Sequence, residues 1–366
     1  MNDHTASVAT PNRVTGYQFF TASLALLILF LAGPVQGQES GLPDYRSPEI
    51  IRTENYSMTL GSRLQIRYLY QNLEESDDNS SFGIRRARLS LSGNAYSRFR
   101  YAMQLGLAGG SVNLLDANIR YEFTPMVTLW AGQGKALFGR QQLTSSGNLH
   151  FVDRTAVDGR FSAGRQAGVA LTGQNESQTF EYGIGIYNGN GINSANDNGK
   201  HMKVARVVLT PFGAYSPSES AHDYPDSPRL AIGFSGLHTT SGSGDSETEI
   251  KRINSEAAFK VHGFNVTGEY YWEESSLSGS SNGLNTNGWY LQGGYLLPDR
   301  KNEIALRYAA ISPDTNTNTD RIETGVAFSH YFMQHRAKIQ ADIRSLEQKV
   351  IDTRDVEFRI QLQISL

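Results

Sequence analysis

The chain has 366 residues, of which 33 are lysine or arginine and 36 are aspartate or glutamate, so its formal net charge of -3 identifies no partner by itself. It contains no cysteine, which excludes disulfides, thiol nucleophiles and zinc–thiolate sites. The mean hydropathy of -0.40 matches that of a soluble protein, but it also suits a membrane β-barrel, in which only every second strand residue faces lipid.

The only long apolar run of the sequence spans residues 19–32 and follows Arg13. It is shorter than the roughly 20 residues that a membrane-spanning helix needs. A small-residue context follows it up to Gly37, with no basic cluster afterwards. We therefore expect a signal peptide over residues 1–37, with a retained membrane anchor as the alternative. Residues 38–57 then form a polar lead-in, expected in the periplasm.

From residue 58 to residue 366 the sequence repeats a short alternation of apolar and polar residues, which is typical of half-buried β-strands. Near the C-terminus, for example, Phe358 and Ile360 flank Arg359. Charges of both signs cannot face lipid, so the polar residues of each alternating strand are expected to line a water-filled interior. We predict sixteen strands, at residues 58–70, 82–92, 98–108, 113–123, 126–134, 165–172, 178–187, 201–210, 229–238, 250–260, 263–272, 287–297, 301–311, 321–331, 335–346 and 355–366.

The connections between these strands alternate between short turns and long polar loops. The long loops are at 71–81, 135–164, 188–200, 239–249, 273–286, 312–320 and 347–354. This rhythm predicts an all-β fold, a 16-stranded antiparallel up-and-down transmembrane β-barrel over residues 58–366, with its long loops outside the cell. Residues 211–228 are the exception: they hold either a small ordered excursion or a missed strand pair, which would give 18 strands. A soluble sandwich or propeller would need a second sheet or a blade repeat, which we do not find.

The longest loop, over residues 135–164, is the natural constriction of the aqueous channel that sixteen strands enclose. It is rich in apolar residues, which we expect to fold it inward against the wall. Its acids are Asp153 and Asp158, so with the residue that follows it the loop has a charge of +3. The five cations, which we predict to select anions, are Lys135, Arg140, Arg154, Arg160 and Arg165.

Strand parity places a second set of cations on the inner wall. The candidates are Arg63, Arg67, Arg86, Arg88, Arg98, Arg100, Arg120, Arg307, Arg336, Lys338 and Arg359. A guanidinium group can replace water around an oxyanion, so such a row could conduct one. The alternative is that these cations are structural and pair across the wall with acids of the same parity. Those acids are Glu122, Glu303, Glu323, Asp342 and Glu357.

Several segments together resemble the phosphate-selective porin O and P family. They are GIRRARLSLSG (83–93), LLDANIRYEF (114–123), AGQGKALFGRQQLTSSGNLHFVDRT (131–155), GRQAGVALTG (164–173) and YGIGIYNGNG (182–191). The resemblance implies a trimeric outer-membrane channel whose inward third loop and arginine–lysine ladder guide phosphate or polyphosphate. Lys135 and Arg154 match the family's loop string, and Arg86, Arg88 and Arg165 match its strand motifs. Gly134 and the final Leu366 depart from the family pattern.

We therefore predict an outer-membrane porin, a passive water-filled channel for small anions with phosphate or polyphosphate as the leading solute. A weakly selective general diffusion porin is the alternative. A lipid hydrolase would need a histidine tied to a nucleophilic serine, and no spacing joins His201, His238 or His330 to one. The expected partners are outer-membrane lipid, inorganic anions and further copies in a homotrimer. We expect no cofactor, no metal site and no nucleic-acid partner.

Overall fold

The computed structural model describes residues 49–124, 126–277, 283–313, 320–349 and 352–366, so the predicted signal peptide lies outside the described residues. The strands are β1 (Glu49–Arg52), β2 (Ser57–Asn72), β3 (Asn79–Ala95), β4 (Phe99–Gly106), β5 (Asn113–Thr124), β6 (Val127–Lys135), β7 (Arg165–Gln174), β8 (Phe180–Tyr187), β9 (Met202–Leu209), β10 (Arg229–Ser241), β11 (Thr248–Val261), β12 (Phe264–Leu277), β13 (Leu284–Leu296), β14 (Asn302–Pro313), β15 (Arg321–Met333), β16 (Ala337–Gln348) and β17 (Thr353–Ser365). The helical elements are α2 (Arg140–Leu143), α3 (Ala156–Phe161) and the single turn η1 (Gly244–Ser246). No helix in the described ranges is long and apolar enough to cross a membrane.

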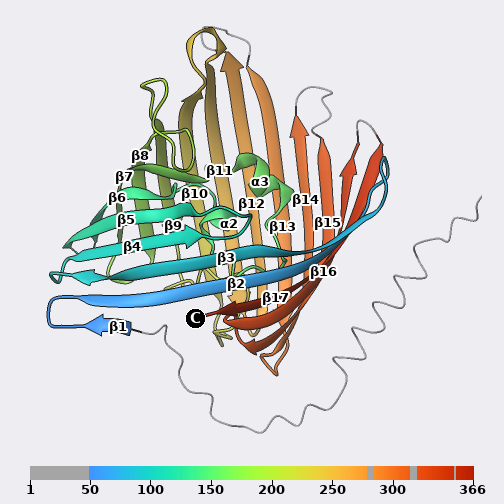
Figure 1. The fold of residues 1–366 in the computed structure, drawn as a ribbon, viewed down its shortest axis with the longest axis horizontal. Coiled ribbons are helices and arrows are strands. Elements are labelled where there is room, and N and C mark those ends of the chain that lie inside the picture. The colour runs from blue at the N-terminus through green and yellow to red at the C-terminus, as the bar shows by residue number, and fades with distance from the viewer. Residues whose placement is uncertain (1–48, 125, 278–282, 314–319, 350–351) are drawn as a thin grey trace, which may run out of the picture. The chain divides into compact units, whose positions relative to one another are not determined.

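Sixteen of the strands form one closed antiparallel barrel (Figure 1). Each strand from β2 to β17 pairs with the next, and β17 returns to β2 with Gln363 opposite Gln65. The short β1 pairs with the first residues of β2. All sixteen predicted strands are found, which confirms the predicted fold class. Within the described part of the chain, residues 211–228 contain no strand, so the 18-strand alternative is wrong.

The two faces of the barrel wall differ as the alternation predicts. In β17, Arg359 and Gln361 are 0% and 1% exposed, whereas Leu362 and Ile364 are 45% and 54% exposed. The same contrast occurs in β14, where Arg307 is buried and its neighbour Leu306 is exposed. An exposed apolar face around a closed barrel suits lipid, and the buried polar face lines the interior.

Two of the predicted wall cations are not in strands. β4 begins at Phe99 and β16 at Ala337, so Arg98 and Arg336 lie in the preceding turns and are exposed. The cause of the first displacement is a tight hairpin, because Tyr96 and Ser97 both have positive φ (50° and 59°). At the second, the backbone N–H of Arg336 closes a turn onto the Met333 carbonyl at 2.9 Å. The assignment of these two arginines to the inner wall was therefore wrong.

Candidate functional site

The connection between β6 and β7, residues 136–164, contacts the buried polar face of the wall. Carboxylates of that face accept hydrogen bonds from the backbone of the connection. The N–H groups of Arg140 and Gln141 donate to Glu269 at 2.7 Å each, that of Val152 to Asp342 at 2.8 Å, and that of Ala156 to Glu323 at 2.7 Å. Backbone donors removed from water need such acceptors, so wall acids on β12, β15 and β16 hold the connection in place.

Aromatic packing fixes the same connection. Phe138 and Phe161 are fully buried, and the ring of Phe161 stacks on Tyr271 of β12 at 5.4 Å between centroids. Gly288 of β13 allows this approach, because a Cβ there would lie 2.5 Å from the Phe161 ring. At the start of α3, the Thr155 hydroxyl accepts the N–H of Asp158 at 2.9 Å and caps the helix.

Asp153 in this connection is surrounded by four arginines of the wall. Its carboxylate oxygens lie 3.0 Å from Arg67, 2.8 Å from Arg85, 3.0 Å from Arg86 and 3.6 Å from Arg359. Burial alone would raise the pKa of Asp153, but Arg86, Arg85 and Arg359 outweigh it and hold that pKa well below its ordinary value. Asp153 therefore stays charged and ties the connection to β2, β3 and β17.

Three of the five predicted loop cations have a carboxylate partner at 3.5 Å or closer. Arg160 donates twice to Glu273, at 3.1 and 2.5 Å, and Arg165 donates twice to Asp116, at 2.9 and 3.1 Å. Arg140 lies 3.5 Å from Glu256, a residue that also pairs with Arg206 at 2.6 Å. These cations are at least partly neutralised.

The other two loop cations bind mainly backbone carbonyls. Lys135 donates from Nζ to Leu143 and Thr144, at 3.0 Å each. Arg154 donates to the Gln141 carbonyl at 2.9 Å and to the Thr144 carbonyl at 2.7 Å, with Asp158 farther away at 3.7 Å. The charges of the Lys135 ammonium and the Arg154 guanidinium are therefore not fully neutralised by a nearby carboxylate.

The predicted wall cations also divide into those with a close carboxylate partner and those without one. Several are paired with acids at 2.6–3.2 Å: Arg67 and Arg86 with Asp153, Arg100 with Glu122, Arg307 with Glu323, and Arg359 with Asp342. Arg63 donates to the hydroxyls of Ser145 and Ser365, and Lys338 donates to the Leu149 carbonyl. Among the described residues, Arg88 and Arg120 have neither a hydrogen-bond nor an ion-pair partner.

These observations define a cationic cluster, consisting of Arg63, Arg88, Lys135, Arg154 and Arg165. Arg88 is repelled by Arg165, Arg63 and Arg154, and Lys135 by Arg154, Arg165 and Arg88. The acids beside the cluster are Asp116, paired with Arg165, and Asp158. The wall formed by β2, β3, β6 and β7 thus has an excess of positive charge in the interior.

Two adjoining cavities of about 440 Å³ each lie between the connection and the wall from β4 to β10. Both are lined by Arg100, Leu137 and Leu143. Their charged lining comprises the cations Arg100, Arg120, Lys135, Arg140 and Arg206 and the acids Asp116, Glu122 and Glu181. Such cavities can hold water and a small solute, and the lining favours an anion. No group of three His, Asp or Glu side chains among the described residues could hold a metal ion.

Arg85 and Arg206 are two of the charged residues of the interior that were missed in the sequence. Arg85 has the wrong parity for the inner face, but the register of β2 and β3 shifts there and turns it toward Asp153. Its only sequence signal is its place in an Arg–Arg pair. Arg206 lies on the inner face of β9 between Val204 and Val208, and these apolar neighbours hide the polar parity.

Comparison with solved structures gives the same fold. An anion-selective porin from Comamonas acidovorans has a TM-score of 0.64 and 13% identity, covering 85% of this chain and 100% of that chain. The outer membrane channel DcaP of Acinetobacter baumannii has a TM-score of 0.63 and 13% identity, covering 86% and 99%. OmpT, an outer membrane protein of Vibrio cholerae in its trimer form, has a TM-score of 0.59 and 13% identity, covering 86% and 100%. At these identities the likeness shows the fold alone. None of the curated protein sequences matches the chain.

A family model gives the more specific result. The model of the phosphate-selective porin O and P family matches residues 58–346, which is well over half of the chain. The resemblance seen in the sequence motifs is thereby confirmed. The chain belongs to the phosphate-selective porin O and P family, and it is a porin of the bacterial outer membrane rather than an enzyme.

Proposed function

We propose that this porin is a passive, water-filled channel that favours small anions, with phosphate or polyphosphate as the leading solute. One observation carries the proposal. Several cations of the interior have no carboxylate within ion-pair distance among the described residues, although the chain as a whole is net negative. They are Arg63, Arg88, Arg120, Lys135 and Lys338. Arg120 and Lys135 line the open cavity between the wall and residues 136–164.

In this proposal residues 136–164 fold into the lumen and narrow it. Their hydrogen bonds to Glu269, Glu323 and Asp342 on the buried face of the wall support this placement. The connection leaves room on the side of β4 to β10, where the two cavities lie. A phosphate entering that space would exchange water for guanidinium and ammonium donors. Because the donors are spread along the path, the ion is not trapped at one of them, which conduction requires.

We also infer a homotrimer in outer-membrane lipid, formed after cleavage of a signal peptide at Gly37. The family membership and the trimer form of Vibrio cholerae OmpT support the trimer. The exposed apolar face of the barrel supports the lipid contact. Native mass spectrometry of detergent-extracted protein measures both the copy number and the mass of the mature chain.

A planar bilayer containing the purified protein tests the function. The reversal potential in a chloride gradient gives the sign of the selectivity, and phosphate added to the chloride solution is then expected to block the current. Cation selectivity would refute the anion preference. Loss of block with retained anion preference would leave a general anion pore.

A second candidate, a weakly selective general diffusion porin, rests on the neutralised cations. Glu273 binds Arg160 and Asp116 binds Arg165, so two of the five loop cations contribute little net field. A reversal potential close to zero together with a large conductance would favour this second function.

A further inference from the structure

The long connection between β9 and β10, residues 210–228, turns inward and meets residues 136–164. Glu219 is buried at its centre and accepts the N–H of His150 at 2.7 Å and the side-chain amide of Gln141 at 3.1 Å. In return, the N–H of Glu219 donates to the Asn148 carbonyl at 3.0 Å. The hydroxyl of Thr144 donates to the Pro217 carbonyl at 3.2 Å. The two connections therefore support each other directly.

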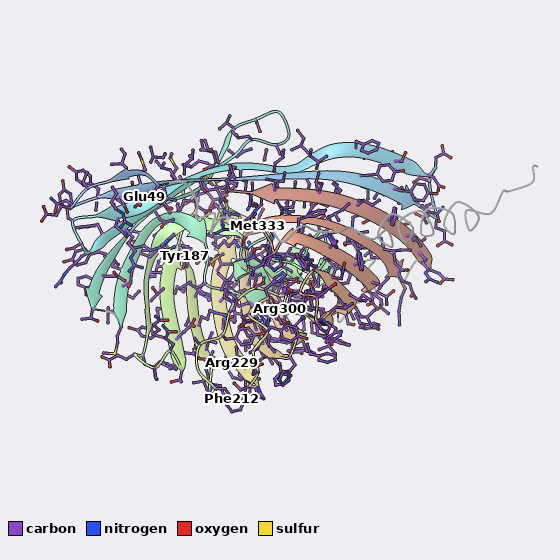
Figure 2. All side chains as sticks on the ribbon, turned by 90° about the horizontal axis from the view of Figure 1, so that it is seen from below. Glu49, Tyr187, Phe212, Arg229, Arg300 and Met333 are labelled. Carbon is purple, nitrogen blue, oxygen red and sulfur yellow. The ribbon has the colours of Figure 1, made fainter. Side chains whose placement is uncertain are left out.

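The wall also holds the 210–228 connection. Lys260 of β11 donates to the carbonyls of Ser216 and Ser220, at 3.2 and 3.0 Å. At the two ends of the connection, Arg229 donates to the Phe212 carbonyl, and these residues lie side by side in Figure 2. A segment tied at its ends and its centre is positioned to shape the space beside it.

Tyr215 is the aromatic side chain by which this connection reaches one of the two cavities. The same cavity is lined by Pro217, by Arg206 of β9 and by Arg140 and Leu143. The Arg140 guanidinium lies over its ring at 4.6 Å, and the Lys260 ammonium lies 5.1 Å from the ring centroid. Cation–π contacts with two charges fix the ring, and a tyrosine has few rotatable bonds to lose.

We propose that the 210–228 connection is a second constriction of the pore, and that Tyr215 is the residue that sets its width. This inference rests on the proposed channel function. The first constriction contributes Arg140 and Leu143, and the second contributes Tyr215 and Pro217 against Arg206 on the wall. The ring fills space that a solute would otherwise use, and it keeps Arg140 and Lys260 apart without adding a charge. The Tyr215 ring therefore limits the size of a permeating solute without removing the cations that line the pore at that place.

The absence of cysteine from the chain allows a direct test, because an introduced thiol is unique. The Tyr215→Cys variant is expected to raise single-channel conductance roughly twofold, since a ring is removed from the constriction. It should also admit larger polyethylene glycols than the wild type. A bulky thiol reagent added to the open channel should then reduce the conductance to below the wild-type value. The anion preference should persist, because the unpaired cations Arg120 and Lys135, which line the adjoining cavity, remain.

Tyr224→Cys is the matched control. Tyr224 belongs to the same connection but contacts Arg300 and does not line either cavity, so its conductance should not change before or after labelling. Tyr215→Trp, which replaces the ring by a larger one, should lower the conductance. If the cysteine variant does not fold, this variant tests whether residue 215 sets the width of the constriction. Equal conductance of wild type, Tyr215→Cys and Tyr215→Trp would overturn the second constriction. A wild-type protein without any conductance would instead refute the channel itself.

Discussion

Arg85 of β3 and Asp153 of the 136–164 connection lie 2.8 Å apart, although strict alternation would turn Arg85 toward lipid. Gln65 pairs with Arg86 and Ile66 pairs with Ile84, so Arg85 is the extra residue of a bulge. A bulge re-aims a side chain, and here it brings two consecutive arginines to one carboxylate. The anchoring of the connection thus depends on a local irregularity of the wall.

Replacement of that carboxylate should loosen the connection. Asp153→Asn removes the partner of several buried or half-buried arginines, and breaking such a pair costs about 3 kcal/mol. We expect a loss of that order in the free energy of unfolding, measured by urea denaturation in lipid vesicles, and more open-channel noise in the bilayer. Asp226→Asn is the control, since Asp226 is exposed. An Asp153→Asn protein as stable and as quiet as the control would contradict the anchoring role.

Anion preference should depend on the unpaired wall cations. The double variant Arg88→Gln, Arg120→Gln removes two charges that have no partner among the described residues. We expect its anion-to-cation permeability ratio to fall clearly below that of the wild type, measured as the reversal potential in a salt gradient. Arg336→Gln removes the same chemical group from an exposed turn and should change nothing. A similar fall in both proteins would mean that total charge, not placement, sets the selectivity.

The strands were predictable because lipid outside and water inside impose a period of two on each of them. β17 shows this clearly, with Arg359 and Gln361 inside and Leu362 and Ile364 outside. Also predictable was the extent of the longest loop, since β6 ends at Lys135 and β7 begins at Arg165. These features depend only on residues close together in the sequence.

The partners of the cations were not predictable in this way. Arg160 binds Glu273, 113 residues later, and this pairing depends on which strand the closed barrel brings opposite the connection. The inward course of the 210–228 connection has no periodic signal either, because it is held by single contacts such as that of Glu219 with His150. Tertiary contacts of this kind decide which charges remain free.

The stability of the 136–164 connection should fall as the pH rises toward neutrality. Burial raises the pKa of Asp158 to about 7, against the opposing effect of Arg154. In the unfolded chain the pKa is about 3.9. The folded protein therefore binds this proton more tightly, and the resulting stability is complete below about pH 4 and is lost as the pH rises through about 7.

Asp158→Asn should abolish this dependence. The difference in unfolding free energy between wild type and variant should then change between acidic and neutral pH, in the direction that favours the variant at higher pH. Urea titrations at several pH values measure it, with Asp226→Asn as the control for the loss of an exposed carboxylate. A constant difference across that range would mean that Asp158 ionises normally.

Acid should act on the 210–228 connection in the opposite sense. Burial lowers the pKa of His222 to about 4, assisted by Lys338 and Lys260 and opposed by Glu303 and Asp223. Its ring lies edge-on to His335 at 4.8 Å, and burial lowers the pKa of His335 as well. An unfolded histidine has a pKa of about 6.5. Stability from the neutral rings is thus complete above that pH and is lost as the pH falls toward about 4, because protonation places new cations beside Lys338.

Hydrogen exchange of residues 210–228 should accelerate over this interval, and the acceleration should be smaller in His222→Gln. His201→Gln, which alters an exposed histidine, should behave as the wild type. Exchange that stays equally slow from neutral pH down to about 4 would show that protons do not reach these rings while the barrel is folded.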